Sequence, residues 1–129
     1  MKKGKVIGIG GIFFKTEDVN STKEWYKSHL GFDTDAWGST FKWKDLKGNM
    51  ATTQWSPFHK QTTHFEPSKK DFMFNYRVVN LEELLEELAR KGVKILGDVK
   101  QYDYGKFAWI LDLDGNKVEL WEPIDDALL

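Results

Sequence analysis

One acidic side chain, late in the sequence, is the strongest candidate for chemistry. Glu119 lies between apolar neighbours in the alternating run Lys117–Trp121. Alternation with a period of two indicates a strand and places Glu119 on one face of it. A carboxylate enclosed on such a face needs a metal, a cation or a proton as its partner. Glu119 is therefore the candidate catalytic residue, as a general base, with a structural ion pair to Lys15 or Arg77 as the alternative.

The three histidines carry the imidazole groups of the chain. His29 falls in a predicted helix, where we expect a partly buried structural role. His59 and His64 lie in a polar stretch without periodicity, five residues apart, and this spacing matches no recognised metal-binding motif. The sequence contains no cysteine, which excludes a thiol nucleophile, a disulfide framework and a cysteine zinc site.

Aromatic residues are abundant, with six tryptophans and nine phenylalanines among 129 residues. They pack cores and dimer interfaces in many proteins, and that is one interpretation. The other is a ligand-binding cup with aromatic walls and a polar floor. The candidate ligand-binding residues are Phe13, Trp43, Gln54, Met73, Asn75, Trp109 and Trp121, grouped around Glu119.

Length and composition indicate one globular domain. Hydrophobic residues make up 40% of the chain and charged residues 30%, and the formal net charge is −1. This balance gives no support for a nucleic-acid or anionic-membrane surface. No apolar run reaches the length needed to span a bilayer, and the N-terminus lacks a signal-peptide core. We expect a cytoplasmic protein.

An internal repeat relates the two halves of the chain. Four residues keep the same spacing in both copies: Phe41, Trp43, Trp55 and Pro57, then Phe107, Trp109, Trp121 and Pro123. A Gly-Asn pair between the strands of each copy predicts a hairpin turn. The turn comes one residue earlier in the first copy, which suggests a bulge or a longer turn there.

Each copy follows a strand and a helix. Val6–Thr16 is predicted to be the first strand, and Asp18 to cap a helix that ends at Gly31. The expected buried face of that helix is Val19, Thr22, Trp25, Tyr26, His29 and Leu30.

The second half repeats this plan. Phe72–Val79 is predicted to be a strand, and Asn80 with Glu83 forms a capping box for the next helix. The buried stripe of that helix is Leu81, Leu84, Leu85, Leu88 and Ala89, and Gly92 ends it. Val93–Leu96 is expected to be a short strand before the last hairpin.

These elements resemble the vicinal-oxygen-chelate superfamily, which includes glyoxalase I, extradiol dioxygenases, fosfomycin-resistance enzymes and bleomycin-binding proteins. The matching segments are Lys15–Val19, Trp25–Phe32, Val78–Leu81, Gly92–Val93 and, most specifically, Asp112–Leu120. The resemblance implies a single α+β domain over residues 1–129. In it, two tandem βαβββ modules, about 5–57 and 70–123, are joined by a linker at 58–69 and form a half-barrel cup.

The resemblance also locates the metal-ligand positions of the superfamily, residue by residue. The first, usually histidine, is Gly11 here, and its second-module equivalent is Met73. The last, a glutamate, is matched by Glu119, and a fourth falls on Thr52 or Thr53, beside Gln54. Glycine has no ligating side chain and a thioether suits soft metals, so one carboxylate remains. We expect no cofactor; a divalent metal would have to bind through Glu119 or the linker histidines.

Two classes of function follow from this resemblance. The first is a small-molecule-binding protein of the bleomycin-resistance type, without the usual metal site, which sequesters an aromatic or amphipathic compound. The alternative is a glyoxalase-like lyase, isomerase or dioxygenase that uses Glu119 as a base or as a weak metal ligand. In either case the expected partners are a small-molecule ligand and a second copy of the chain.

Overall fold

A computed structural model describes residues 2–129. The first half contains β1 (Lys5–Thr16), α1 (Val19–Leu30), β2 (Ser39–Lys44) and β3 (Met50–His59). The second half contains β4 (Phe72–Val79), α2 (Leu81–Arg90), β5 (Lys100–Tyr102), β6 (Gly105–Leu111) and β7 (Lys117–Pro123), and a short 3-10 helix, η1 (Asp125–Leu128), follows.

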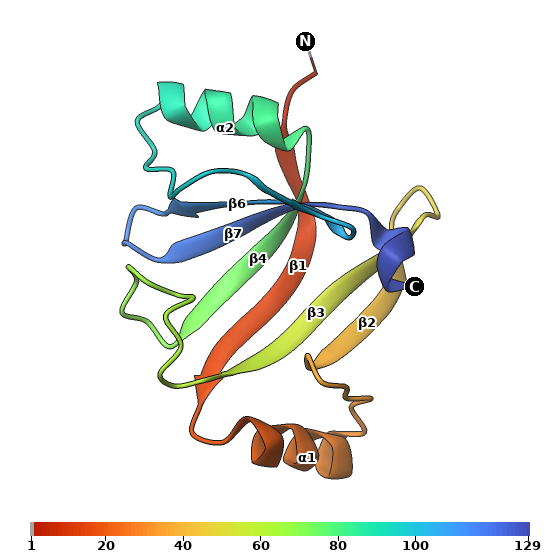
Figure 1. Ribbon diagram of the computed structural model, residues 1–129. Coiled ribbons are helices and arrows are strands. Elements are labelled where there is room, and N and C mark those ends of the chain that lie inside the picture. The colour runs from red at the N-terminus through yellow and green to blue at the C-terminus, as the bar shows by residue number, and fades with distance from the viewer. Residues whose placement is uncertain (1) are drawn as a thin grey trace.

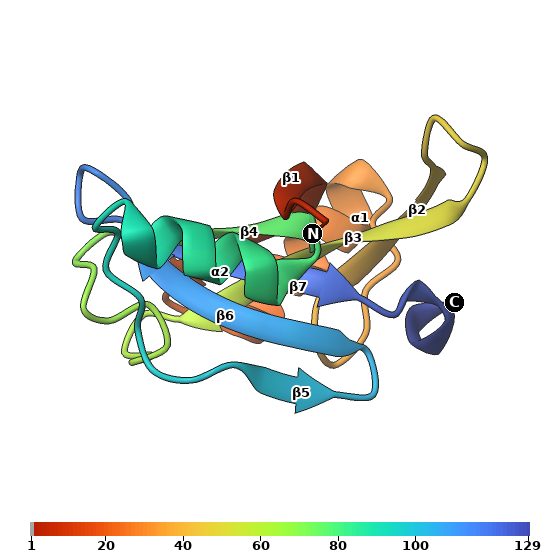
Figure 2. The ribbon, with the colours of Figure 1, turned by 90° about the horizontal axis from the view of Figure 1, so that it is seen from above.

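The seven strands form one open, curved sheet in the order β2-β3-β1-β4-β7-β6-β5 (Figure 1). The two halves join where β1 pairs antiparallel with β4, and parallel pairs β1–β3 and β4–β7 flank this junction. Figure 2 shows the sheet from above, with β5 and β6 at one side and β2 and β3 at the other. This arrangement is the α+β, glyoxalase-like fold that the sequence predicts, and the fold class is confirmed.

Helix α1 begins and ends as predicted but is less buried than predicted. The Asp18 carboxylate accepts a hydrogen bond from the Ser21 N–H at 3.0 Å, and Gly31 ends the helix with a φ of 74°. None of its residues is buried. Trp25 is 50% exposed, and its ring stacks on the exposed His29 ring at 4.4 Å. The structural, partly buried role expected for His29 is therefore wrong.

Helix α2 buries Leu81 and Leu85 of its predicted stripe and half-buries Leu84 and Leu88, but Ala89 is exposed. The predicted capping box is absent. Leu81 and Leu85 pack with Val78, Ala108 and Leu120 in the larger of two hydrophobic clusters.

The N-terminus of α2 is closed by distant groups. Asn80 adopts a left-handed conformation with a φ of 53°, and its side-chain amide donates to the Lys3 carbonyl. The Leu81 N–H donates instead to the carboxylate of Glu122, on β7, at 2.8 Å. Tertiary contacts thus replace the local Asn80–Glu83 cap.

The strand count differs between the two halves. Only β2 and β3 follow the helix in the first half, where an isolated bridge between Thr34 and Ser39 is all that precedes them. In the second half the predicted strand Val93–Leu96 is reduced to a bridge between Ile95 and Ile110, and the strand lies later, at Lys100–Tyr102.

The internal repeat is real in sequence but shifted in register. Both hairpins span five residues between the last paired positions, Lys44 with Met50 and Leu111 with Lys117, so neither a bulge nor a longer turn distinguishes the first. In the first hairpin, Phe41 lies one residue closer to the turn than Phe107 does in the second hairpin. A shift of one residue turns each side chain to the opposite face. Trp55 consequently packs beside Tyr26 and Phe32 under α1, whereas Trp121 lies on the cavity side.

The connection between the halves folds back onto the sheet. Phe65 is fully buried, and it forms the smaller hydrophobic cluster with Phe13 and Met73.

Within residues 2–129, no helix has the length and apolar character needed to cross a membrane.

Candidate functional site

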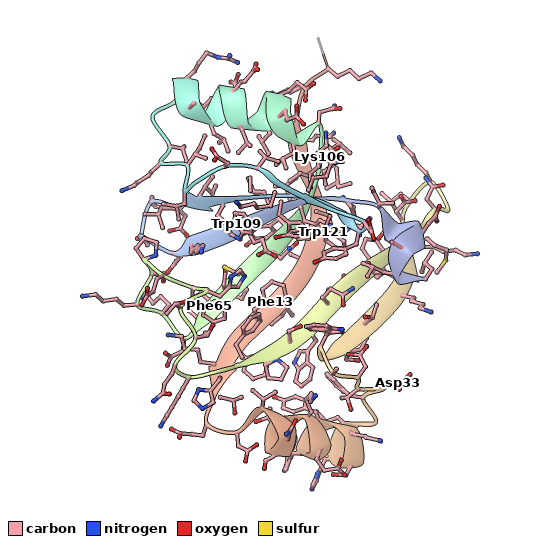
Figure 3. All side chains as sticks on the ribbon, viewed as in Figure 1. Phe13, Asp33, Phe65, Lys106, Trp109 and Trp121 are labelled. Carbon is pink, nitrogen blue, oxygen red and sulfur yellow. The ribbon has the colours of Figure 1, made fainter. Side chains whose placement is uncertain are left out.

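The curved sheet holds an open cavity of about 660 Å³ on one face. Eight aromatic side chains and several polar ones line it. The lining residues are Phe13, Asp35, Trp37, Thr40, Gln54, Ser56, Phe58, His64, Asn75, Tyr102, Tyr104, Phe107, Trp109, Glu119, Trp121, Ala127 and Leu128. In Figure 3, Trp109 and Trp121 lie above Phe13 over the middle of the sheet, and Phe65 lies at its side.

Paired residues on neighbouring strands build a polar row across the floor. The row runs through six strands, in the order Thr40, Gln54, Gly11, Asn75, Glu119 and Trp109. The Thr40 hydroxyl donates to Gln54 Oε1 at 2.8 Å, and Asn75 Nδ2 donates to Glu119 Oε1 at 2.6 Å. Strand pairing alone therefore brings residues from positions 11 to 119 into one line.

The row is interrupted at Gly11, where an aromatic ring takes the space of a side chain. A Cβ added at Gly11 would lie 2.7 Å from Cζ of Phe13. The Phe13 ring therefore covers the first metal-ligand position of the superfamily pattern.

Glu119 is 5% exposed, and both of its carboxylate oxygens are occupied. Oε1 accepts from Asn75, and Oε2 accepts from Trp109 Nε1 at 2.8 Å. His64 Nε2 lies 3.3 Å from Oε2. This environment suits an ionised carboxylate, because N–H groups are directed at both oxygens.

His64 reaches the site from the connection between the halves. Its ring stacks on Phe58 with the centroids 5.5 Å apart, and Lys117 Nζ donates to its backbone carbonyl at 2.6 Å. His59, the other linker histidine, does not line the cavity and accepts a hydrogen bond from the Gln61 N–H. Both histidines lie in a segment without periodicity, and only the fold separates their roles.

The structure brings five of the seven candidate ligand-binding residues to the cavity wall: Phe13, Gln54, Asn75, Trp109 and Trp121. Two lie elsewhere. Met73 is fully buried, since it pairs with Phe13 on the neighbouring strand and Phe65 covers it. The Trp43 ring packs against the Arg77 guanidinium and does not reach the cavity.

The structural ion pair considered for Glu119 is absent. Arg77 pairs with Asp125 at 2.6 Å. Lys15 Nζ lies over the Phe65 ring, 5.8 Å from its centroid. The nearest cation-forming group to the carboxylate is thus an imidazole.

The residues around Glu119 differ from the metal-ligand set of the superfamily pattern. Asn75, not Met73, lies opposite both Gly11 and Glu119, and its amide N–H faces the carboxylate. An N–H group is a donor and does not ligate a cation. Across residues 2–129, no group of three or more histidine or acidic side chains is placed to hold a metal ion.

The rim of the cavity is formed by residues that no sequence pattern predicted. Asp35 and Trp37 come from the loop before β2 and Leu128 from η1, while Tyr102 ends β5 and Tyr104 lies in the turn after it. Loops have no periodic pattern that assigns a face to their side chains, although an aromatic residue in a turn, such as Trp37, is a usable signal.

The electrostatic character of the cavity is acidic. Asp35 and Glu119 are its two carboxylates, and among the described residues that line it there is no lysine or arginine. Burial raises the pKa of the Tyr104 phenol, and the nearby Tyr102, Glu119 and Asp103 add to this effect. Negative charge on these neighbours disfavours a further anion at the phenol oxygen.

Comparison with known proteins agrees with this architecture. The family model described as Glyoxalase/Bleomycin resistance protein/Dioxygenase superfamily matches residues 8–120, and the chain belongs to this superfamily. No curated protein sequence matches the chain.

Solved structures share the fold at low sequence identity. Methylmalonyl-CoA epimerase from Mycobacterium tuberculosis is 19% identical, with a TM-score of 0.65, covering 95% of this chain and 92% of that chain. A variant of the Streptomyces coelicolor epimerase in complex with 2-nitronate-propionyl-CoA is 16% identical, with a TM-score of 0.68 and coverage of 93% and 99%. A superfamily member from Vibrio splendidus 12B01 is 14% identical, with a TM-score of 0.56 and coverage of 92% and 99%.

Proposed function

We propose that the cavity binds a flat aromatic compound that is uncharged or carries a protonated amine. The observation that carries this proposal is the composition of the wall, in which eight aromatic rings surround two carboxylates. Aromatic faces attract cations through their quadrupoles, and carboxylates attract them directly. The cavity volume of about 660 Å³ lies in the range typical of small-molecule sites.

The same charge argument disfavours anionic ligands. The ligand of the Streptomyces structure is a coenzyme A derivative and therefore carries phosphate groups. Phosphate binding relies on arginine, lysine or helix N-termini. The described residues that line the cavity include no arginine or lysine, so a coenzyme A derivative is not the expected ligand.

We propose that binding does not require a metal. Support comes from the N–H donors on both oxygens of Glu119 and from the Phe13 ring over Gly11. A cation at Glu119 would compete with the N–H groups of Asn75 and Trp109 for the carboxylate oxygens.

A second candidate function is proton transfer by Glu119 and His64. The observation that favours it is the 3.3 Å contact between His64 Nε2 and Glu119 Oε2 at the cavity wall. A carboxylate beside an imidazole can orient it as a general base. The substrate class would be a carbonyl compound that loses a proton from the adjacent carbon and later regains it, as in an isomerisation.

Three naphthalene compounds of equal size test the binding proposal: naphthylmethylammonium, naphthylmethanol and naphthoate. Calorimetry should rank the ammonium compound first and naphthoate last, with about tenfold between the extremes, equivalent to about 1.4 kcal/mol. Asp35→Asn should reduce this preference, because it removes one of the two carboxylates of the cavity. The loop should keep its shape, since the remaining carbonyl oxygen can still accept the Trp37 and Gly38 N–H groups. Asp33→Asn, two residues away and outside the cavity, is the control.

Equal or tighter binding of naphthoate, or no binding of any of the three, would contradict the proposal. The series also separates the second candidate function when methyl naphthyl ketone is added. Deuterium from heavy water should appear at its methyl group, by NMR, only if the protein catalyses proton transfer.

A further inference from the structure

A buried ion pair outside the cavity holds the C-terminal helix η1 against the sheet. The guanidinium of Arg77 donates from Nη1 to Asp125 Oδ1 at 2.7 Å and from Nη2 to Asp125 Oδ2 at 2.6 Å. Side-chain exposure is 6% for Arg77 and 15% for Asp125. A two-pronged pair of this kind fixes orientation as well as distance.

Further contacts hold this pair in place. Asp125 Oδ1 also accepts from the backbone N–H and the hydroxyl of Thr52, and Arg77 Nη1 donates to the Thr52 carbonyl. The guanidinium lies between two indoles, 5.5 Å from the Trp43 ring centroid and 5.4 Å from that of Trp121. Four strands, β2, β3, β4 and β7, therefore contribute to the attachment of η1.

The attachment of η1 to the sheet places residues of this helix at the cavity wall. Ala127 and Leu128, two and three residues after Asp125, line the cavity beside Trp121. The segment is also tied at its start, where the Ile124 N–H donates to the Tyr104 carbonyl. Figure 1 shows η1 in front of β3, away from both helices.

We infer that η1 is a size-selecting wall of the cavity and that Arg77 and Asp125 are positioning residues, which act on the ligand through Leu128. For its ligand this inference rests on the proposed function. The existence of the wall itself does not, because it can be measured without any ligand.

The labelling rate of a single introduced cysteine tests directly whether η1 restricts access to the cavity, since the chain contains no cysteine of its own. Gln54→Cys places a thiol two residues along β3 from Thr52, on the cavity side. Labelling of this thiol by a maleimide should become at least several-fold faster when Asp125→Asn is added. Asp126→Asn, at an exposed position in the same helix, should leave the rate unchanged.

If Asp125→Asn does not fold, Leu128→Ala provides a second test of the wall, because the Leu128 substitution leaves the buried ion pair intact. It too should accelerate labelling several-fold, without a matching change in melting temperature. Unchanged labelling in the folded Asp125→Asn and Leu128→Ala proteins would overturn the inference.

Ligand size is the second readout. The affinity for naphthylmethylammonium relative to the larger anthrylmethylammonium should fall at least threefold in Leu128→Ala, and remain unchanged in Asp126→Asn. An unchanged ratio would overturn the size-selecting role. If neither probe binds the parent protein, the proposed function and the size-selecting role both fail, and the labelling rates still decide whether η1 forms the wall.

Discussion

At the scale of single residues, the cavity floor depends on the hydrogen bonds that one carboxylate, that of Glu119, accepts. Glu119 sits at the floor of an aromatic cavity, and neutral N–H donors from two neighbouring strands meet its oxygens. A buried acceptor that keeps its donors is stable, whereas a buried donor that faces another donor is costly.

We therefore expect Glu119→Gln to destabilise the fold. The new amide group must face either Asn75 Nδ2 or Trp109 Nε1, so one N–H loses its acceptor. The free energy of unfolding, measured with urea, should fall by about 1–3 kcal/mol. Glu17→Gln, at a side chain that is 80% exposed, is the matched control and should have little effect. Equal stability of the two variants would mean that Glu119 is not held as described.

At the scale of elements, the two related hairpins are closed by the same device. Asp45 accepts the N–H groups of Lys47 and Asn49, and Asp112 accepts those of Asp114 and Asn116. Asp112 also accepts from the Asn116 side chain at 3.1 Å. Burial works against the charged form of Asp112, but the backbone and side-chain N–H groups outweigh it and hold its pKa below the usual value of 3.8.

This shift makes the stability of the second hairpin dependent on pH. A carboxyl with a lowered pKa stabilises the fold above its unfolded pKa, and this contribution disappears as the pH falls through the folded value. Asp112→Asn should thus be less stable than the parent protein near neutral pH, and the difference should shrink below pH 3.8. Urea unfolding at several pH values measures this. A difference that stays constant down to the acid limit would assign the effect to packing instead of charge.

At the scale of the whole molecule, the outer face of the sheet remains partly uncovered. Phe13 and Asn75 line the cavity, and strand alternation therefore turns Ile12 and Phe74 outwards. These two side chains pair across β1 and β4 and are 44% and 41% exposed. An apolar strip of this kind is typical of a surface that another protein covers.

We propose that a second copy of the chain covers this strip. Light scattering should then give about twice the chain mass of 15.0 kDa at micromolar concentration. Phe74→Glu should shift the protein to the monomer. Leu46→Glu, at the fully exposed tip of the first hairpin, should not. A parent protein with the mass of a single chain would rule out this dimer.

The sequence by itself determined the fold class and the strand that carries Glu119. Period-two alternation, the Asp18 and Gly31 helix signals and the hairpin turns are local, so they are legible in one chain without its contacts. Together with the superfamily resemblance, strand alternation also assigned Gln54, Asn75 and Glu119 to the cavity floor, because these residues lie on regular strands.

Only the tertiary structure decided which side chains meet across the cavity. His64, Trp37 and Leu128 lie on loops or a short terminal helix, where no period assigns a direction. Trp55 and Trp121 occupy equivalent places in the repeat, yet a one-residue shift in strand register puts them in different environments. Within a hairpin the position of the turn sets this register, and a slip of one residue reverses every side chain. Long-range pairing of β4 with β1 and β7 selected Asn75 over Met73 as the neighbour of Glu119.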